Sequence, residues 1–352
     1  MMIKELSEAI GVSGQEDAVR EVILKAIKDH VKDIRIDPLG NVLAVKPGDG
    51  TRPEAPRVMV AAHMDEVGFM VLGIDANGAI RVGAVGGFDP RILPGLRVVI
   101  GQDRVPAVFN WKPIHMGYDR TTVTLDNLRL DIGATSKEQA NGKVNVGDRA
   151  AFVTAYREHG RIAVGKAFDD RVGCAVLIEL IQGEPLPFDV HVAFTVQEEV
   201  GLRGAQVAAQ AIKPDVAFVL EGTTAHDLPP VEEDPEAPRT SPVTELGKGP
   251  ALTLADNSVI VDRRLLNHLR ETAEVEGIPY QYKQAAIGGT DAGAIMVANA
   301  GVPSAVISVP CRYIHSPAAI CNLDDVANAA RLLRAALARF TPAVLARAGE
   351  ME

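Results

Sequence analysis

Four short runs of apolar residues constrain the fold of this chain more than any other feature. They are rich in Val, Ile and Phe and occupy residues 57–63, 190–196, 215–221 and 303–309. None alternates apolar and polar residues as a half-exposed strand does, so each run predicts a strand that is buried on both faces. Helical patterns at 170–182, 203–212, 262–277 and 324–340 supply the necessary cover. We therefore expect an α/β fold, with a mostly parallel sheet and helices on both of its faces.

The pattern changes between residues 70 and 161. Short β-like runs recur there, Asn77-Gly78 is a hairpin signal, and no convincing amphipathic helix is found. We expect a small β-barrel-like domain at 70–161, inserted between the two parts of the α/β domain, 1–69 and 162–352. A further irregular stretch, 226–250, is dense in proline and acidic residues and predicts a surface loop.

Composition excludes several classes of partner. The chain of 352 residues has a formal net charge of −10 and no basic cluster with interleaved aromatic residues, which argues against nucleic acid. No apolar segment approaches the roughly 18 residues of a membrane span, and the N-terminus does not resemble a signal peptide. The three cysteines show no CxxC spacing and are read as reduced thiols. We expect a cytoplasmic protein without a membrane partner.

Acidic and imidazole side chains gather where the predicted strands end. In open α/β sheets, ligands bind beyond the carboxyl ends of the strands, because the connecting loops converge there. Five separate segments deliver such residues to this edge: His63, Asp65, Asp169, Glu198, Glu199, Glu221 and His315. The sequence thus predicts one site that is built from distant parts of the chain.

These residue types suit two divalent ions. Zinc takes imidazole nitrogens and carboxylate oxygens as ligands and keeps an open position in catalytic sites; cobalt and manganese accept similar ligands. In our hypothesis, Asp169 bridges two ions, His63 and Glu221 complete one site, and Glu199 and His315 complete the other. Ligation would also explain why two glutamates stand side by side in "VQEEVG".

The remaining two residues receive supporting roles. A water shared by two ions becomes more acidic, so Glu198 can act as the base that takes its proton and passes it to a leaving amine. Asp65 stands two residues after His63 and is well placed to hydrogen-bond the other nitrogen of that ring.

Each residue also has a simpler interpretation. Asp169 and Asp170 could cap the following helix, and Glu221 could pair with Arg312. Glu198 and Glu199 could form a solvated turn. His226 competes with Glu221 as a ligand, and Cys311 with His315 could suggest a soft metal site. The glycine-rich "GGTDAGAI" at 288–295 could be a tight turn that begins a helix, with Asp291 in its first turn, or a wall of the substrate pocket.

Five motifs together resemble a known family. In order, they are "AHMDEVG", "GKAFDDRVGC", "VQEEVGLRGA", "GGTDAGAI" and "RYIHSP". This order and approximate spacing are similar to those of the tetrahedral aminopeptidases, metallopeptidases whose relatives include deblocking and glutamyl aminopeptidases. Some members have been labelled endoglucanases. The resemblance extends over nearly the whole chain.

The resemblance implies a di-metal exopeptidase that assembles into a hollow particle of twelve subunits, with the β-rich insertion as the subunit-contact domain. It also implies His63, Asp169 as bridge, Glu199 and His315 as metal ligands, Glu198 as the general base and Asp65 as the residue that orients His63. The Asp169–Asp170 peptide is expected to be cis. The sequence departs from the common pattern at Glu221, where many members have aspartate, and in its longer, more acidic 226–250 loop.

The sequence predicts an aminopeptidase that removes N-terminal residues from short peptides with two divalent ions per subunit. Zn²⁺ is the first choice, with Co²⁺ or Mn²⁺ as alternatives. Two other functions stay open: a related metal-dependent amidohydrolase or deacylase, and a non-catalytic scaffold on the same fold. An endoglucanase is disfavoured, because glycosidase carboxylates flank a sugar bond several ångströms apart, whereas Glu198 and Glu199 are neighbours.

Overall fold

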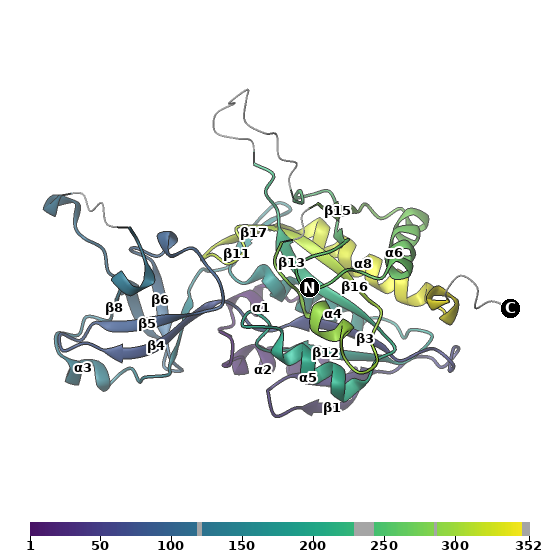
Figure 1. The fold of residues 1–352 in the computed structure, drawn as a ribbon, viewed down its shortest axis with the longest axis horizontal. Coiled ribbons are helices and arrows are strands. Elements are labelled where there is room, and N and C mark those ends of the chain that lie inside the picture. Colours follow the sequence, from purple (N-terminus) through teal and green to yellow (C-terminus); the bar gives the residue numbers. More distant parts are fainter. Residues whose placement is uncertain (118–121, 229–242, 285–286, 347–352) are drawn as a thin grey trace, which may run out of the picture.

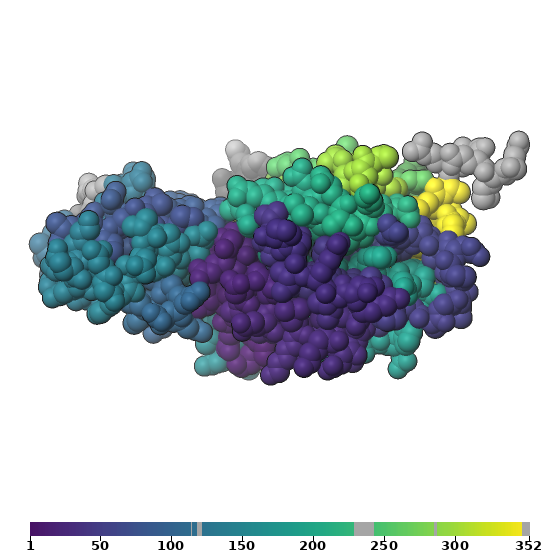
Figure 2. Space-filling view, turned by 90° about the horizontal axis from the view of Figure 1, so that it is seen from below, coloured from purple at the N-terminus to yellow at the C-terminus, as the bar shows by residue number. Residues whose placement is uncertain are grey.

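A large mixed sheet and a separate closed barrel make up the molecule (Figure 1). The computed structural model describes residues 1–117, 122–228, 243–284 and 287–346. In the space-filling view the barrel forms a lobe beside a larger one, whose face on this side is covered by N-terminal residues (Figure 2). Within the described residues, no helix is long and apolar enough to cross a lipid bilayer.

The four predicted buried strands form the parallel centre of the large sheet. In spatial order they are β12 (Val190–Thr195), β3 (Val58–His63), β13 (Val216–Thr224) and β16 (Ser304–Arg312). Nearly every residue of these strands is buried, as their unbroken apolar runs require. Their common direction brings the four carboxyl ends to one edge.

Shorter strands extend the sheet, and all their pairings are antiparallel except that of β14 with β15, so the sheet is mixed overall. Most of them flank the parallel centre, and β14 and β15 pair off the main path. They are β1 (Lys32–Ile36), β2 (Val42–Lys46), β10 (Arg157–His159), β11 (Ile162–Gly165), β14 (Ala251–Thr253), β15 (Gln281–Lys283) and β17 (Ala319–Asn322). β10, although it lies within the range expected for the insertion, pairs with β11 of this sheet.

Helices cover both faces of the sheet, which confirms the expected fold class. One group packs around α4 (Phe168–Gln182) and comprises α1 (Ile3–Glu8), α2 (Asp17–Ile27) and α8 (Leu323–Arg339), with α6 (Arg263–Glu276) packed on α8. A second group pairs α5 (Arg203–Ile212) with α7 (Asp291–Met296).

Local sequence signals set the ends of the longer helices. The Asp262 side chain accepts the backbone N–H of Arg264 at the start of α6, and Gly277 ends that helix with a φ of 60°. Asn322 caps α8 in the same way by accepting the N–H of Asp324. The four predicted helices therefore begin and end within about two residues of their expected limits.

The barrel closes in the order β4-β5-β8-β7-β6-β9. Its strands are β4 (Gly68–Ile74), β5 (Ile80–Val85), β6 (Arg97–Ile100), β7 (Val105–Phe109), β8 (Leu130–Asp131) and β9 (Arg149–Phe152). Gly78, with a φ of 85°, makes the predicted hairpin turn between β4 and β5. The barrel has its own core, in which the Phe69 ring contacts the edges or faces of Phe88, Phe109 and Phe152.

Short helical segments also occur in this part of the chain. Their bounds are α3 (Lys137–Asn141), η1 (Pro90–Ile92), η2 (Ile114–Met116) and η3 (Leu125–Asn127); η4 (Pro342–Leu345) follows α8 near the other end of the chain. α3 is absent from the sequence expectation because five residues are too few to show an amphipathic period. The centre of the predicted acidic loop, 229–242, lies outside the described residues.

Candidate metal centre

All five predicted metal ligands meet at the carboxyl edge of the parallel strands. His63 is the last residue of β3, Glu221 lies in the second half of β13, Glu199 follows β12, and Asp169 is at the start of α4. His315 follows β16 and has a left-handed backbone, with a φ of 56°. The convergence arises from parallel strands that share one direction, as the sequence hypothesis assumed.

Asp169 lies between two imidazole–carboxylate pairs. Its Oδ1 is 3.2 Å from His63 Nε2, which is 3.3 Å from Glu221 Oε1. Its Oδ2 is 3.3 Å from His315 Nε2, which is likewise 3.3 Å from Glu199 Oε2. The two groups are therefore His63–Asp169–Glu221 and Asp169–Glu199–His315, and within each group the candidate ligand atoms lie within 4.8 Å of one another.

The donor atoms and their surroundings fit a pair of divalent ions. Each group offers one imidazole nitrogen with carboxylate oxygens, a ligand set that suits zinc, cobalt or manganese. Glu221 Oε2 is buried and has no hydrogen-bond partner among the described residues. A buried carboxylate oxygen without a partner is costly, and a cation would compensate for it.

Burial disfavours the charged form of the acids in this cluster. It raises the pKa of Glu199 to about 8 and raises the pKa of Glu198 and of Glu221 well above the ordinary glutamate range. Burial acts in the same sense on Asp169, but hydrogen bonds from the two imidazoles hold its pKa below the ordinary value. Acids that share so small a space are stable as anions only beside positive charge.

The second ring nitrogens of the two histidines contact backbone carbonyls. His63 Nδ1 is 3.1 Å from the carbonyl oxygen of Asp65, whereas the Asp65 carboxylate is 3.6 Å away. His315 Nδ1 is 2.9 Å from the carbonyl oxygen of Gly87, which follows barrel strand β5. Such contacts fix the orientation of a metal-binding imidazole. The role of the Asp65 side chain in orienting His63 stays a prediction, since the backbone of Asp65 is the nearer partner.

The Asp65 carboxylate instead anchors the glutamate pair. It accepts hydrogen bonds from the backbone N–H of Glu198 at 3.0 Å and of Glu199 at 3.2 Å. The Ser13 hydroxyl donates to it at 2.6 Å. Asp65 is completely buried, so these donors replace the water that the carboxylate loses. Sequence reasoning missed Ser13, although it lies in the "GVSG" segment near the N-terminus.

The Asp169–Asp170 peptide is cis, as the family resemblance implied. Asp170 also accepts the N–H of Gly173 at 3.0 Å, which is the helix-capping role considered for this pair. A second oxygen of Asp170 accepts the backbone N–H of His63 at 3.2 Å. The two aspartates are thus divided between two tasks: Asp169 faces the histidines, and Asp170 joins α4 to β3.

A fully buried ion cluster behind the site was also missed. Lys166 Nζ lies 2.6 and 2.7 Å from the two carboxylate oxygens of Glu66, and Arg171 Nη2 lies 3.3 Å from one of them. Arg171 Nε also donates to the carbonyl oxygen of Met64 at 2.7 Å. Burial lowers the pKa of Lys166 to about 8 despite its acidic partner. The sequence could have indicated this cluster, because Glu66 lies in "AHMDEVG" and Lys166 and Arg171 lie in "GKAFDDRVGC", the motifs that also carry His63 and Asp169.

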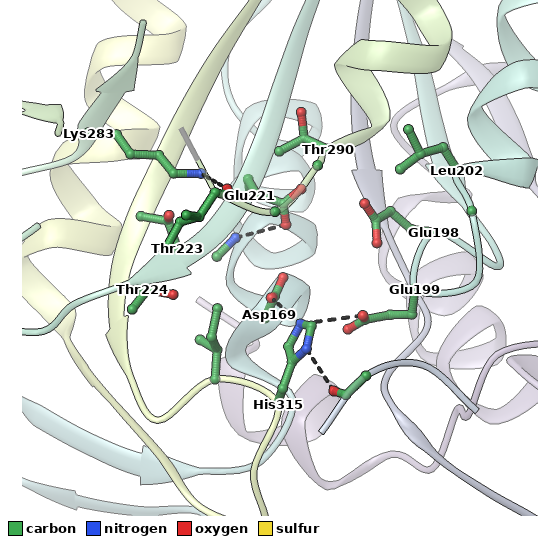
Figure 3. Close-up of a pocket in the computed structure, with 17 residues that line it drawn as sticks. Asp169, Glu198, Glu199, Leu202, Glu221, Thr223, Thr224, Lys283, Thr290 and His315 are labelled. Carbon is green, nitrogen blue, oxygen red and sulfur yellow. Dashed lines mark hydrogen bonds and ion pairs between the residues drawn. The ribbon is translucent and has the colours of Figure 1, made fainter. Parts of the chain in front are cut away.

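A cavity of about 590 Å³ opens over the two groups (Figure 3). Its wall includes Glu198, Leu202, Thr223, Lys283 and the Gly288–Gly289–Thr290 segment. Both interpretations of "GGTDAGAI" therefore apply: the segment lines the cavity and leads into α7, where Asp291 stands in the first turn. Asp291 is buried and accepts a hydrogen bond from Thr195.

Three competing interpretations are not supported by the geometry. Arg312 pairs with Asp227 and not with Glu221. Among the described residues, neither His226 nor Cys311 belongs to a group that could hold a metal ion. Cys311 lies opposite Cys321 on the neighbouring strand, and both thiols are buried.

A zinc-peptidase-like fold with two acid–imidazole groups on one shared carboxylate defines a metallopeptidase. The family model described as M42 glutamyl aminopeptidase matches residues 40–332. The chain belongs to this family and is a metallo-aminopeptidase, which confirms the resemblance and the activity inferred from the motifs.

Individual relatives extend over almost the whole chain. A glutamyl aminopeptidase of Lactococcus lactis subsp. cremoris is 34% identical, over 95% of this chain and 94% of its own length. The structure of a TET aminopeptidase from a marine sediment archaeon of the Thaumarchaeota superposes with a TM-score of 0.89 at 37% identity, and 98% of each chain is covered. The TET1 peptidase of Pyrococcus horikoshii gives a TM-score of 0.84 at 33% identity, covering 97% of this chain and 100% of its own.

Proposed function

We propose that this aminopeptidase removes N-terminal residues from short peptides with two divalent ions per subunit. The observation that carries the proposal is Asp169, whose two oxygens each face a different imidazole–carboxylate pair. His63 and Glu221 would hold one ion with Asp169, and Glu199 and His315 would hold the other. When bound, the ions would acidify a water molecule and polarise the carbonyl of the first peptide bond.

Glu198 is the proposed proton carrier. Its side chain lines the cavity and belongs to neither ligand group. Only 9% of it is exposed, and burial raises its pKa well above the ordinary glutamate range, which makes its carboxylate a stronger proton acceptor. It would take one proton from the attacking water and give that proton to the nitrogen of the leaving amine. The carboxylate is then restored for the next cycle.

The structure also suggests how Glu198 is kept in position. Its backbone N–H is held by the Asp65 carboxylate, and its carbonyl oxygen accepts the N–H groups of Gly201 and Leu202, each at 2.9 Å. The turn after β12 is thereby closed on itself and tied to the loop after β3. Asp65 is thus proposed as a positioning residue, through the Glu198–Glu199 backbone as well as through His63.

Glu198→Gln tests this assignment. The amide keeps the shape of the side chain but cannot accept the proton, so we expect kcat to fall about 100- to 10,000-fold while two ions per subunit remain. Metal content by plasma mass spectrometry and hydrolysis of leucyl anilide are the measurements. Glu179→Gln, an exposed position on α4, is the control. Normal turnover in Glu198→Gln would remove this residue from the mechanism.

A blocked substrate separates the peptidase from its alternatives. An aminopeptidase should cleave leucyl anilide and ignore N-acetyl-leucyl anilide, because it requires a free α-amine, whereas a deacylase should attack the acetyl group. A scaffold should cleave neither compound and should show no dependence on added metal.

Zinc is the ion we propose first, with cobalt and manganese as alternatives, because sites of imidazole and carboxylate accept all three. Chelated protein resupplied with one ion at a time, and then assayed with free aminoacyl anilides, will rank them. If magnesium alone restored full activity, this assignment of the metal would be wrong.

We further propose that residues 1–69 and 162–352 form the catalytic domain and that 70–161 mediate assembly into a dodecamer. The TET1 peptidase of Pyrococcus horikoshii can assemble into a tetrahedron or a large octahedral shell. In this chain, Trp111 and Met116 expose 58% and 70% of their surface on the inserted segment, as interface residues do before assembly. Light scattering that gave only a monomer of 37.4 kDa would contradict the proposal.

A cytoplasmic location completes the proposal. Its support is that Cys174, Cys311 and Cys321 are free and buried. Fractionation of the producing cells would test it.

A further inference from the structure

The side chain of Arg149 joins the barrel to the loop between α1 and α2. Arg149 begins β9, where it stands opposite Met70 of β4. Its Nε donates to the carbonyl oxygen of Ser13 at 3.1 Å, and its Nη1 donates to the carbonyl oxygen of Gly147 at 2.9 Å. Ser13 lies 136 residues earlier in the chain, outside the barrel. Arg149 thus reaches from the barrel to hold a backbone carbonyl of another part of the molecule.

The contact with Arg149 is one of three that fix Ser13. The backbone N–H of Ser13 donates to the carbonyl oxygen of Glu66 at 3.3 Å, and its hydroxyl donates to Asp65 Oδ2 at 2.6 Å. The guanidinium also packs against Gly14, which has a φ of 81° and where a Cβ would lie 3.0 Å from Arg149 Nη2. The backbone contacts on both sides of Ser13 therefore aim its hydroxyl at Asp65.

Asp65 carries this restraint to the turn after β12 that contains Glu198 and Glu199 (the glutamate turn). Its carboxylate accepts the backbone N–H of Glu198 at 3.0 Å and that of Glu199 at 3.2 Å. Ser13 and Asp65 are 3% and 0% exposed, so water cannot readily replace the hydrogen bonds between them. An unbroken chain of hydrogen bonds and backbone therefore runs from Arg149 in the barrel to the proposed proton carrier and to a proposed metal ligand.

We propose that Arg149 is a positioning residue for the aminopeptidase reaction. By holding the carbonyl of Ser13, it keeps the Ser13 hydroxyl on Asp65, and Asp65 keeps the backbone of the glutamate turn in place. The inference rests on the proposed function, which gives Glu198 and Glu199 their roles. It also gives the barrel a task within its own subunit that is separate from assembly.

Other contacts keep the barrel attached when Arg149 is changed. The carbonyl oxygen of Gly87, beyond β5, is 2.9 Å from His315 Nδ1. The hydroxyl of Thr154, which follows β9, donates to the carbonyl oxygen of Pro317. A substitution at Arg149 leaves both contacts intact, so the variant should fold with the barrel in contact with the rest of the molecule.

Arg149→Met tests the proposal, because methionine keeps an unbranched side chain but donates no hydrogen bond. We expect kcat on leucyl anilide to fall about tenfold, as for a small misplacement of catalytic groups, while KM stays within about twofold because the cavity wall is unchanged. In metal-free protein, amide hydrogen exchange of the peptide that contains Glu198 and Glu199 should become faster. A residue that only stabilised the barrel would lower the melting temperature and leave kcat and this exchange unchanged.

Controls separate this role from a loss of charge or of folding. Arg97→Met, at an exposed position at the start of β6, removes a charge from the same barrel and should alter neither kcat nor the exchange. Arg149→Lys keeps the charge and can still donate to one carbonyl, so it should recover part of kcat. If Arg149→Met does not fold, Arg149→Lys takes its place and should show the same changes to a smaller extent.

The decisive comparison uses the Ser13→Ala background. The link from Ser13 to Asp65 is already broken there, so adding Arg149→Met should lower kcat by less than about twofold. A fall in kcat of the same size with and without the Ser13 hydroxyl would overturn the inference, as would unchanged kcat and unchanged exchange in Arg149→Met alone. If the unmodified enzyme does not cleave leucyl anilide, the proposed function fails, and hydrogen exchange still decides whether Arg149 holds the glutamate turn.

Discussion

The clearest test of the site's construction is to remove the Asp65 carboxylate. This group is completely buried and accepts hydrogen bonds from Ser13 Oγ and from the backbone N–H groups of Glu198 and Glu199. In Asp65→Ala, all three donors would lose their acceptor in a place that water enters poorly. The variant therefore probes whether the glutamate turn is held by this carboxylate.

The expected magnitude follows from those three bonds. A buried donor left without a partner costs about 1–3 kcal/mol, and the separate costs do not add fully. We expect Asp65→Ala to lower the free energy of unfolding by about 3–5 kcal/mol, the range seen when one partner of a buried charged pair is removed. Ser13→Ala removes one donor and leaves both backbone bonds intact, so its cost should be only about 1 kcal/mol.

Activity should respond more strongly than stability. Because the turn carries both Glu198 and Glu199, its displacement should lower kcat/KM at least tenfold in Asp65→Ala, at a temperature where the variant is still folded. Urea denaturation at one protein concentration gives the stability, and leucyl anilide hydrolysis gives the activity. The reasoning would be refuted if Asp65→Ala lowered the free energy of unfolding by less than about 1 kcal/mol and left kcat/KM within about twofold of the unmodified enzyme.

Two further outcomes follow from the site. Metal-free protein should lose stability as pH rises from about 4.5 to about 9. Burial raises the pKa of Glu199 from 4.5 to about 8. Burial alone would lower the pKa of His315, but the hydrogen bond to Asp169 outweighs burial and raises that pKa from 6.5 to about 9. In this pH range the folded state holds protons that the unfolded state has released, so the free energy of unfolding falls by about 1.4 kcal/mol per pH unit for each such proton. Melting curves of chelated and metal-loaded protein at several pH values will show whether bound ions abolish this pH dependence. Gly222→Ala should reduce metal content, because a Cβ there would lie 2.7 Å from Asp169 Cα. Gly142→Ala should not, because a Cβ there would lie 3.9 Å from the nearest atoms around it.

Specific outcomes would contradict the pH prediction and the Gly222→Ala prediction. A metal-free protein whose melting temperature rises or stays level across this pH range would contradict the raised pKa values. Full metal content in Gly222→Ala would show that the backbone at the start of α4 can move without loss of the site.

Much of the fold could be predicted because its signals are local. The strands of the parallel centre are unbroken apolar runs, and the helices beside them carry a 3.6-residue period with recognisable caps. Once those strands are parallel, their carboxyl ends must lie at one edge, and so the sequence alone predicts that His63, Glu221 and the glutamate pair meet there.

Other features depend on contacts between residues far apart in the sequence. The burial of Lys166 against Glu66, 100 residues away, follows from how α4 packs behind β3, and no periodicity reports it. The same holds for the carbonyl of Gly87, which the barrel brings to His315, 228 residues away. The short helix α3 and the pairing of β10 with the large sheet were missed because each involves only a few residues.

By itself the sequence determined the α/β class, the inserted barrel and the residue types that reach the sheet edge, since residue pattern and strand direction act over short stretches of chain. Only the tertiary structure decided that each Asp169 oxygen faces a different histidine, that the Asp65 carboxylate holds the glutamate turn, and that Lys283 stands in the cavity wall. The physical reason is that hydrogen bonds and ion pairs require atoms within about 3 Å, and only the packing of distant segments sets such distances.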